Sequence, residues 1–277
     1  MKRILFAICI LSATANISAQ QLRTPSPSPG QTIKQDFGLS SIELSYSRPG
    51  VKNRKIFGDV RPYGVIWRTG ANGATTLTFG DDVTIGGTLI KAGKYGLLTI
   101  PNLDNWVIII TKQLDVTSPD AYKKEMDAVR LNVKPVMLQQ PVETFSMQFV
   151  NVKPNSCDLQ LLWENTSVSF AITTDIDSKV TAQINELMNK DNRPYFNAAM
   201  YYMDNGKDLN QALAWFNKAL EQNQNAFFMV YQKAVCLSKL GRKDEAKATA
   251  QKGIEAAKAA KNDDYVALSE KLIASLK

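Results

Sequence analysis

The 277-residue sequence contains no histidine. A Ser-His-Asp triad, a Cys-His pair, a histidine-ligated zinc ion and an imidazole general base are therefore all excluded. The sequence also lacks a phosphate-binding glycine-rich loop before a helix, metal-ligand spacing and a nucleophile elbow. From these absences we predict no cofactor, no metal and no catalytic residue, and we favour a protein that is not an enzyme.

Cysteine is scarce as well, with only Cys9, Cys157 and Cys236. Cys9 falls in an apolar leader, Cys157 in a β-rich region and Cys236 in a predicted helix. A disulfide between the last two could form in an oxidising compartment but would have to join two domains. We expect two separate buried thiols.

The first nineteen residues have the pattern of a secretory signal. Lys2 and Arg3 form a basic start, residues 4–11 are apolar, and Ala19 offers a small residue before a cleavage point. The apolar run is well short of the roughly 20 residues that a membrane-spanning helix needs. We expect residues 1–19 to be a signal peptide and the mature chain to be exported, periplasmic or secreted, with no transmembrane segment.

Loss of that leader reduces the formal net charge from +7 to +5, because Lys2 and Arg3 leave with it. A mildly basic surface favours encounters with acidic surfaces or anionic ligands over long range. Nucleic acid is not an expected partner outside the cytoplasm.

A β-rich domain is predicted from the pattern of residues 31–173. Before it, residues 20–30 are rich in proline and serine and are predicted to be an extended lead-in. Strands are predicted at residues 42–46, 75–79, 83–85, 95–100, 106–111, 129–133, 144–149, 159–163 and 168–172. Short strands without long helices between them favour an antiparallel β-sandwich of jelly-roll-like type. One short helix is predicted within it, with Ser118 as cap, Pro119 at its first position and residues 120–128 following.

The C-terminal part has a helical period. Residues 174–193 are predicted to be a bridging helix, and residues 194–277 an array of two helix pairs with a capping helix. The predicted helices of the array are residues 195–205, 209–222, 227–240, 243–260 and 263–276. Matched residues recur 34 positions apart at Ala212 and Ala246, Ala219 and Gly253, and Leu220 and Ile254. This spacing resembles that of the tetratricopeptide repeat. Two helix pairs are fewer than usually fold independently, so we expect the array to pack against the β domain or the bridging helix.

A more particular motif lies between the strands predicted at residues 42–46 and 75–79. It consists of Ser47-Arg48-Pro49-Gly50-Val51-Lys52, Arg54-Lys55-Ile56-Phe57-Gly58, Pro62-Tyr63-Gly64 and Trp67-Arg68-Thr69-Gly70-Ala71-Asn72. Further matches occur at Pro27-Ser28-Pro29, Ala92-Gly93-Lys94-Tyr95 and Val133-Lys134-Pro135. Over about residues 25–173 the chain thus resembles the bacterial family called domain of unknown function 2911. The resemblance implies export and a β-rich fold, but no known reaction. Relatives usually carry an acidic residue where this chain has Gly73, so any chemistry of that carboxylate is absent here.

Six side chains of this motif are candidates for ligand binding, namely Arg48, Arg54, Tyr63, Trp67, Arg68 and Asn72. Arginine suits two-point recognition of a carboxylate or a phosphate, and an aromatic ring can stack on a sugar. The alternatives are that the basic residues are solvated or paired with acids elsewhere in the sheet, that the tryptophans fill the core, and that Asn72 serves a turn.

Three functional hypotheses follow. The favoured one is a non-enzymatic envelope binding protein, with a protein or peptide partner on the concave surface of the repeats and an anionic or glycan ligand on the β domain. The second is a histidine-independent enzyme that acts on a glycan or an anionic ester through Arg48, Arg54, Trp67 and Arg68. The third is a purely structural protein in which the repeats stabilise the sandwich.

Overall fold

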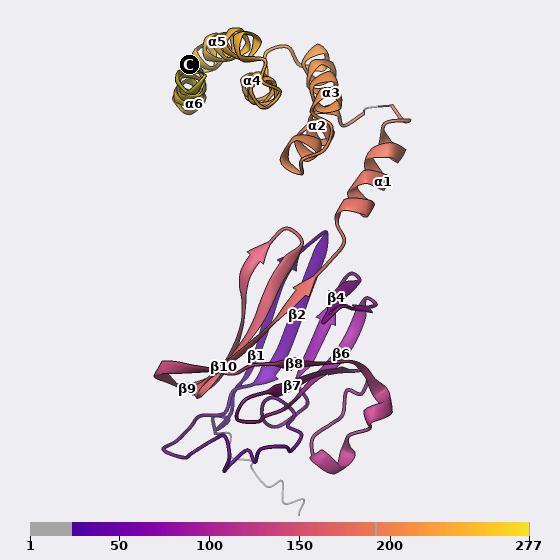
Figure 1. Ribbon diagram of the computed structural model, residues 1–277, viewed down its shortest axis with the longest axis vertical. Coiled ribbons are helices and arrows are strands. Elements are labelled where there is room, and N and C mark those ends of the chain that lie inside the picture. Colours follow the sequence, from indigo (N-terminus) through magenta and orange to yellow (C-terminus); the bar gives the residue numbers. More distant parts are fainter. Residues whose placement is uncertain (1–23, 192, 277) are drawn as a thin grey trace, which may run out of the picture. The chain divides into compact units, whose positions relative to one another are not determined.

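The computed structural model describes residues 24–191 and 193–276 (Figure 1). The chain divides into two compact units, one ending at Thr174 and the other starting at Asp175. The signal peptide predicted at residues 1–19 and the start of the predicted lead-in lie outside the described residues. Each unit is described by itself.

The first unit consists of two antiparallel sheets. One sheet has the order β1 (Gly30–Phe37), β2 (Ser40–Ser47), β3 (Thr76–Phe79), β6 (Gly93–Ile100), β7 (Trp106–Thr111) and β8 (Asp127–Val133). The other has the order β5 (Thr88–Ile90), β4 (Val83–Ile85), β10 (Ser156–Thr173) and β9 (Val136–Lys153). Both sheets contribute side chains to one buried hydrophobic cluster, whose members run in sequence from Phe37 to Ile172. The predicted antiparallel β-sandwich is therefore confirmed.

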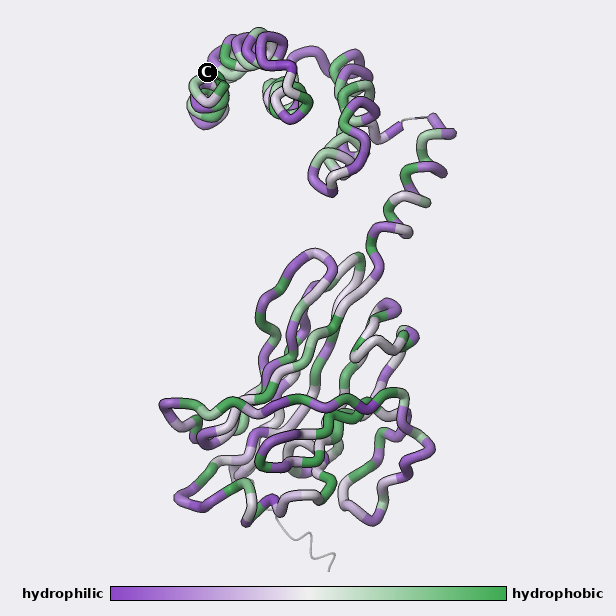
Figure 2. The backbone as a smooth tube through the Cα atoms, viewed as in Figure 1, coloured by the Kyte–Doolittle hydropathy of each residue, from purple (hydrophilic) through white to green (hydrophobic). Residues whose placement is uncertain are grey.

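Alternating burial explains why these segments form strands. In β2, Ile42, Leu44 and Tyr46 are buried whereas Glu43 between them is exposed. Figure 2 shows hydrophobic and hydrophilic positions interleaved along the strands of this unit. Each sheet thus presents one apolar face to the core, and burial of those faces stabilises the sandwich.

Strand β10 corrects the prediction of two separate strands at residues 159–163 and 168–172. The buried positions change phase between Trp163 and Val168, which made the segments look distinct. The register against β9 shifts on both sides of Glu164, whose φ is +52°. An extra residue in such a β-bulge restores inward alternation without ending the strand.

The predicted helix at residues 120–128 is wrong. Two 3-10 turns, Pro119–Ala121 and Lys124–Met126, occupy its first part, and β8 begins at Asp127. Ser118 makes no side-chain capping hydrogen bond, and neither turn buries a residue. Pairing with β7 therefore determines the structure from Asp127 onward.

Two strands, β1 and β5, were not predicted from the sequence. In β1 only Phe37 is buried, so the segment lacks a clear apolar face, although it pairs with β2 along its whole length. Strand β5 has three residues and buries only Ile90. Pairing with a neighbour, rather than side-chain pattern, defines both strands.

The second unit contains α1 (Asp177–Leu187), α2 (Tyr195–Asp204), α3 (Leu209–Gln222), α4 (Phe227–Lys239), α5 (Lys243–Ala259) and α6 (Asp263–Ser275). The last five agree with the predicted helices to within one residue at each end. Helices α2 and α3 pack as one pair and α4 and α5 as another, and α6 packs on α5 (Figure 1). Among the described residues no helix is long and apolar enough to cross a membrane.

Small residues allow the helices of each pair to pack closely. Ala212 and Ala246, which match across the two pairs, are both fully buried. A Cβ added to Gly253 would lie in ordinary contact with Ser269 of α6 and Val230 of α4. The 34-residue spacing therefore marks the positions where neighbouring helices meet.

Among the contacts between the bridging helix α1 and the array is a cluster around one charged residue. The carboxylate of Asp177 accepts hydrogen bonds from the Tyr201 hydroxyl at 2.8 Å and the Lys207 ammonium at 2.9 Å. These bonds hold the pKa of Asp177 below its ordinary value. Burial, with the hydrogen bond to Asp177, raises the pKa of Tyr201 to about 12.

A glycine pair tests the packing of the sandwich. A Cβ added to Gly96 of β6 would lie 2.4 Å from the main-chain oxygen of Gln113, whereas a Cβ on Gly73 would meet nothing within 4 Å. We expect Gly96→Ala to lower the free energy of unfolding by about 1–3 kcal/mol, because the backbone must shift. Gly73→Ala should change it by less than about 0.5 kcal/mol. Urea unfolding of both variants measures this, and equal midpoints would contradict it.

Candidate functional site

The motif that stood out in the sequence forms a long loop between β2 and β3, residues 48–75, which we call the bridging loop. Its main chain is hydrogen-bonded to both sheets. Trp67 exchanges two hydrogen bonds with Thr99 of β6, at 2.7 and 2.9 Å. At its start, the carbonyl of Pro49 accepts the N–H of Phe145 in β9 at 2.9 Å. The bridging loop is therefore fastened to both sheets of the sandwich by main-chain hydrogen bonds.

The predicted ligand-binding arginines donate hydrogen bonds within the protein. Arg48 bonds through Nε to the carbonyl of Phe145 at 3.1 Å and through Nη2 to Ser146 Oγ at 2.7 Å. Arg54 donates to the carbonyls of Val51 and Gly50 at 2.9 and 2.7 Å. These bonds organise the loop and use part of the donor capacity that the prediction assigned to a ligand.

Arg68 and Asn72 are joined to each other. Arg68 Nη1 donates to the carbonyl of Asn72 at 2.6 Å, and Asn72 Nδ2 donates to the carbonyl of Ser28 at 3.0 Å. Asn72 has a φ of +57°, a left-handed conformation that asparagine tolerates better than most residues. The turn interpretation of Asn72 thus has direct geometric support.

Trp67 lies in an aromatic cluster in the core rather than on an open platform. It is 3% exposed, and its indole N–H donates to the carbonyl of Gly70 at 2.9 Å. Its ring stacks on Trp163 of β10 with centroids 5.6 Å apart and lies edge-on to Phe57 and Trp106. Of the two aromatic residues among the predicted ligand-binding side chains, Tyr63 is exposed and Trp67 is buried.

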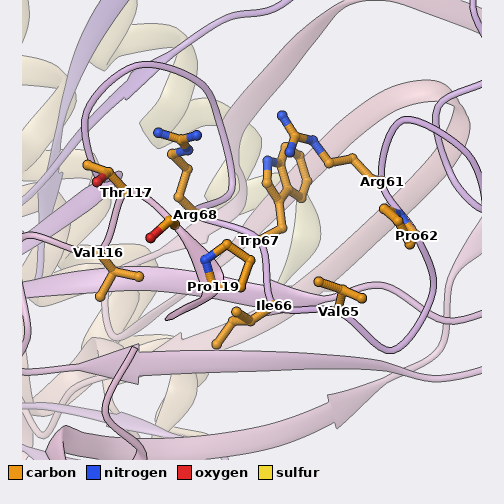
Figure 3. Close-up of a pocket in the computed structure, with 10 residues that line it drawn as sticks. Arg61, Pro62, Val65, Ile66, Trp67, Arg68, Val116, Thr117 and Pro119 are labelled. Atoms are coloured by element: carbon orange, nitrogen blue, oxygen red, sulfur yellow. The ribbon is translucent and has the colours of Figure 1, made fainter. Parts of the chain in front are cut away.

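Arg61 belongs to the basic stretch of the bridging loop but is not among the six predicted ligand-binding residues. Its guanidinium carbon lies 5.6 Å from the centre of the Trp67 ring (Figure 3). Its Nε is buried and has no hydrogen-bond partner among the described residues. Burial lowers the pKa of Arg61, and the nearby charges of Arg68 and Arg54 lower it further. The only sequence signal was a run of basic residues opposed locally by Asp59 alone.

Arg61 lines two hollows. The first, of about 160 Å³, is lined by Trp67, Arg68 and the segment around Pro119 (Figure 3). The second, of about 250 Å³, is lined by Arg54, with Arg61 common to both. Figure 3 shows the guanidinium groups of Arg61 and Arg68 pointing away from Val65 and Ile66. Arg48, Tyr63 and Asn72 line neither hollow.

The chemistry that these side chains can perform is recognition of negative charge. In the described part of the chain, no group of three or more Cys, Asp or Glu residues is placed to hold a metal ion. Cys157 and Cys236 are both free and buried, as predicted. Burial, with the charge of Asp158, raises the pKa of Cys157 to about 11, so this thiol is protonated and weakly nucleophilic at neutral pH.

The second unit has a separate surface feature, which we call the aromatic row. It consists of half-buried rings on α2, α4 and α6, namely Phe196, Phe227, Phe228, Tyr231 and Tyr265. Ring centroids are 5.4 Å apart for Phe196 and Phe228, 5.1 Å for Phe227 and Tyr265, and 5.6 Å for Tyr231 and Tyr265. The first helix of each pair and the last helix thus share one continuous set of rings.

Replacement of Arg48 tests whether it fastens the loop to β9. Arg48→Met keeps the apolar stem but removes both donors to Phe145 and Ser146, so we expect the free energy of unfolding to fall by about 1–3 kcal/mol. Lys34→Met, at an exposed position of β1, is the matched control and should change it by less than about 0.5 kcal/mol. Chemical denaturation followed by tryptophan fluorescence gives both values; equal effects would remove the proposed role of Arg48.

Models of known protein families match both units of the chain. Tetratricopeptide repeat models match residues 193–225, which contain α2 and α3, and residues 229–259, which cover α4 from its third residue and all of α5. No curated protein and no solved structure matches the chain. The model described as "Protein of unknown function (DUF2911)" matches residues 28–172, more than half of the chain. Its combination with the repeats suggests a protein-interaction module. The chain belongs to the DUF2911 family.

Proposed function

We propose that this protein is an exported binding protein of the cell envelope whose helical array docks a segment of a partner protein. The repeats support the interaction role, because stacked helix pairs of this kind provide extended binding surfaces. The basic, apolar and small-residue pattern of residues 1–19 supports export.

The observation that carries the proposal is the aromatic row. Tyr231 and Tyr265 are half-buried, so each ring packs against its neighbour on one side and retains surface for a ligand on the other. Aromatic rings supply large contact areas at low conformational-entropy cost and are enriched among the residues that dominate binding energy. The partner segment is therefore a polypeptide with apolar side chains that pack along α2, α4 and α6.

The geometry of the bridging loop does not favour the catalytic alternative. Arg48, Arg54 and Arg68 all donate to acceptors of the protein itself, and Trp67 is in the core. These bonds support a structural role for the three arginines and give no support to attack on a glycan or an ester.

A pull-down with the full mature chain tests the partner proposal. The wild-type protein, Tyr231→Ser and Lys258→Ser are each immobilised and exposed to an extract of the cells that make the protein. Lys258 is exposed on α5 and serves as the matched control. We expect a partner that the wild type and Lys258→Ser retain and that Tyr231→Ser binds about tenfold more weakly or worse.

Two results would contradict this proposal. One is the absence of any retained polypeptide. The other is equal retention by Tyr231→Ser, measured after circular dichroism has shown that the helices of this variant are intact.

A second candidate ligand, an anion on the first unit, is favoured by the charges of the bridging loop. Arg54 and Arg68 are close enough to Arg61 to lower its pKa. None of the three forms an ion pair with an acidic side chain in residues 24–191 and 193–276. An anion that binds the folded chain here offsets this repulsion and raises the melting temperature.

A further inference from the structure

The second hollow has an unusual lining for a protein surface. Three basic side chains line it, Lys52, Arg54 and Arg61, together with the indole of Trp163. Pro27 and Pro49 provide apolar, rigid walls. At about 250 Å³ the space exceeds that of a single water molecule and suits a small organic molecule.

Two residues that line this hollow, Arg61 and Trp163, each have a buried side-chain donor without an acceptor in the described part of the chain. Arg61 Nε and Trp163 Nε1 are both buried, and neither has a partner among the described residues. Trp163 is only 2% exposed, and its neighbour in the stack, Trp67, does have an acceptor for its own indole N–H. A buried donor without a partner destabilises the folded chain, so an acceptor that reaches these two groups from the hollow gains a hydrogen bond from each.

The charges around the hollow specify the kind of acceptor. No acidic residue lines the hollow in the described part of the chain, although the carboxylate of Glu143 accepts the main-chain N–H of Lys52 at 3.0 Å. The same carboxylate forms no ion pair with Lys52, Arg54 or Arg61 within the described part of the chain. Three cationic side chains against one carboxylate leave an excess of positive charge.

We propose that the second hollow binds the oxyanion group of a small organic ligand, a carboxylate or a phosphate. The guanidinium group of Arg61 holds the oxyanion, because its planar array of donors matches both groups. Arg54, whose Nε and Nη2 already donate to Val51 and Gly50, adds positive charge beside it. The Trp163 N–H donates a further hydrogen bond, and Pro27 and Pro49 pack on the apolar part of the ligand. This site rests on the proposed anion binding of the first unit and does not depend on the helical array.

The indole signal of Trp163 provides a direct test. The full mature chain, labelled with ¹⁵N, is titrated with sodium phosphate at pH 7, with ionic strength held constant by sodium chloride. The chain has four tryptophans, and Trp163→Phe identifies the signal of interest. We expect that signal to move to a saturating end point, whereas the signal of Trp215 on α3 stays fixed. A parallel titration with sodium acetate shows whether phosphate or carboxylate binds more tightly.

Charge variants show whether Arg61 is responsible. Arg61→Gln should weaken binding about tenfold or more, since it removes a charged hydrogen-bond donor. Arg61→Lys keeps the charge but loses the planar fork, so an intermediate affinity is expected. Lys34→Gln lowers the net charge equally at an exposed position outside the hollow and should leave the affinity within about twofold.

The outcomes separate this site from the broader proposal. If phosphate or acetate raises the melting temperature while the Trp163 signal stays fixed, the first unit binds anions elsewhere and this site is overturned. If neither changes, anion binding by the first unit fails as well. Unchanged affinity in Arg61→Gln and Arg61→Lys likewise overturns the assignment.

Discussion

The stacking of Trp67 on Trp163 is the contact on which the first unit depends most. Trp67 comes from the bridging loop and Trp163 from β10, and Phe57 and Trp106 lie edge-on in the same cluster. The loop cannot leave the sandwich without opening this core. Arg48, Arg54 and Arg68 of this loop donate to main-chain carbonyls, whereas the guanidinium of Arg61 lies against the Trp67 ring.

That arrangement accounts for both the specificity of the motif and its charge. Arg54 and Arg68 donate to carbonyls of the loop itself, whereas Arg48 and Asn72 donate to carbonyls outside it, of Phe145 and Ser28. Arg61 differs because its neighbours are other cations and its Nε has no acceptor among the described residues. A charge that folding leaves without a partner is better explained by a ligand than by stability.

Much of the fold could be predicted from periodicity, because buried positions dominate it. The helix ends were predicted to within one residue where small residues recur every 34 positions. Three features could not be predicted in this way: the bulge at Glu164, the short turns before Asp127 and the polar strand β1. Strand pairing, rather than the local pattern of side chains, determines them. For the candidate site, sequence identified the basic segment. It could not distinguish the arginines that bond to the main chain from Arg61, because that difference arises only when Trp67 and Trp163 meet.

The most direct test of this account is a crystal structure of the full mature chain soaked in sodium selenate, with anomalous scattering used to locate selenium. Selenate is a tetrahedral oxyanion and reports on the chemistry proposed for the second hollow. The account predicts an anomalous peak within hydrogen-bonding distance of Arg61 and Trp163 Nε1. A hollow that holds only water, while selenate occupies other basic surfaces of the same crystal, would contradict it.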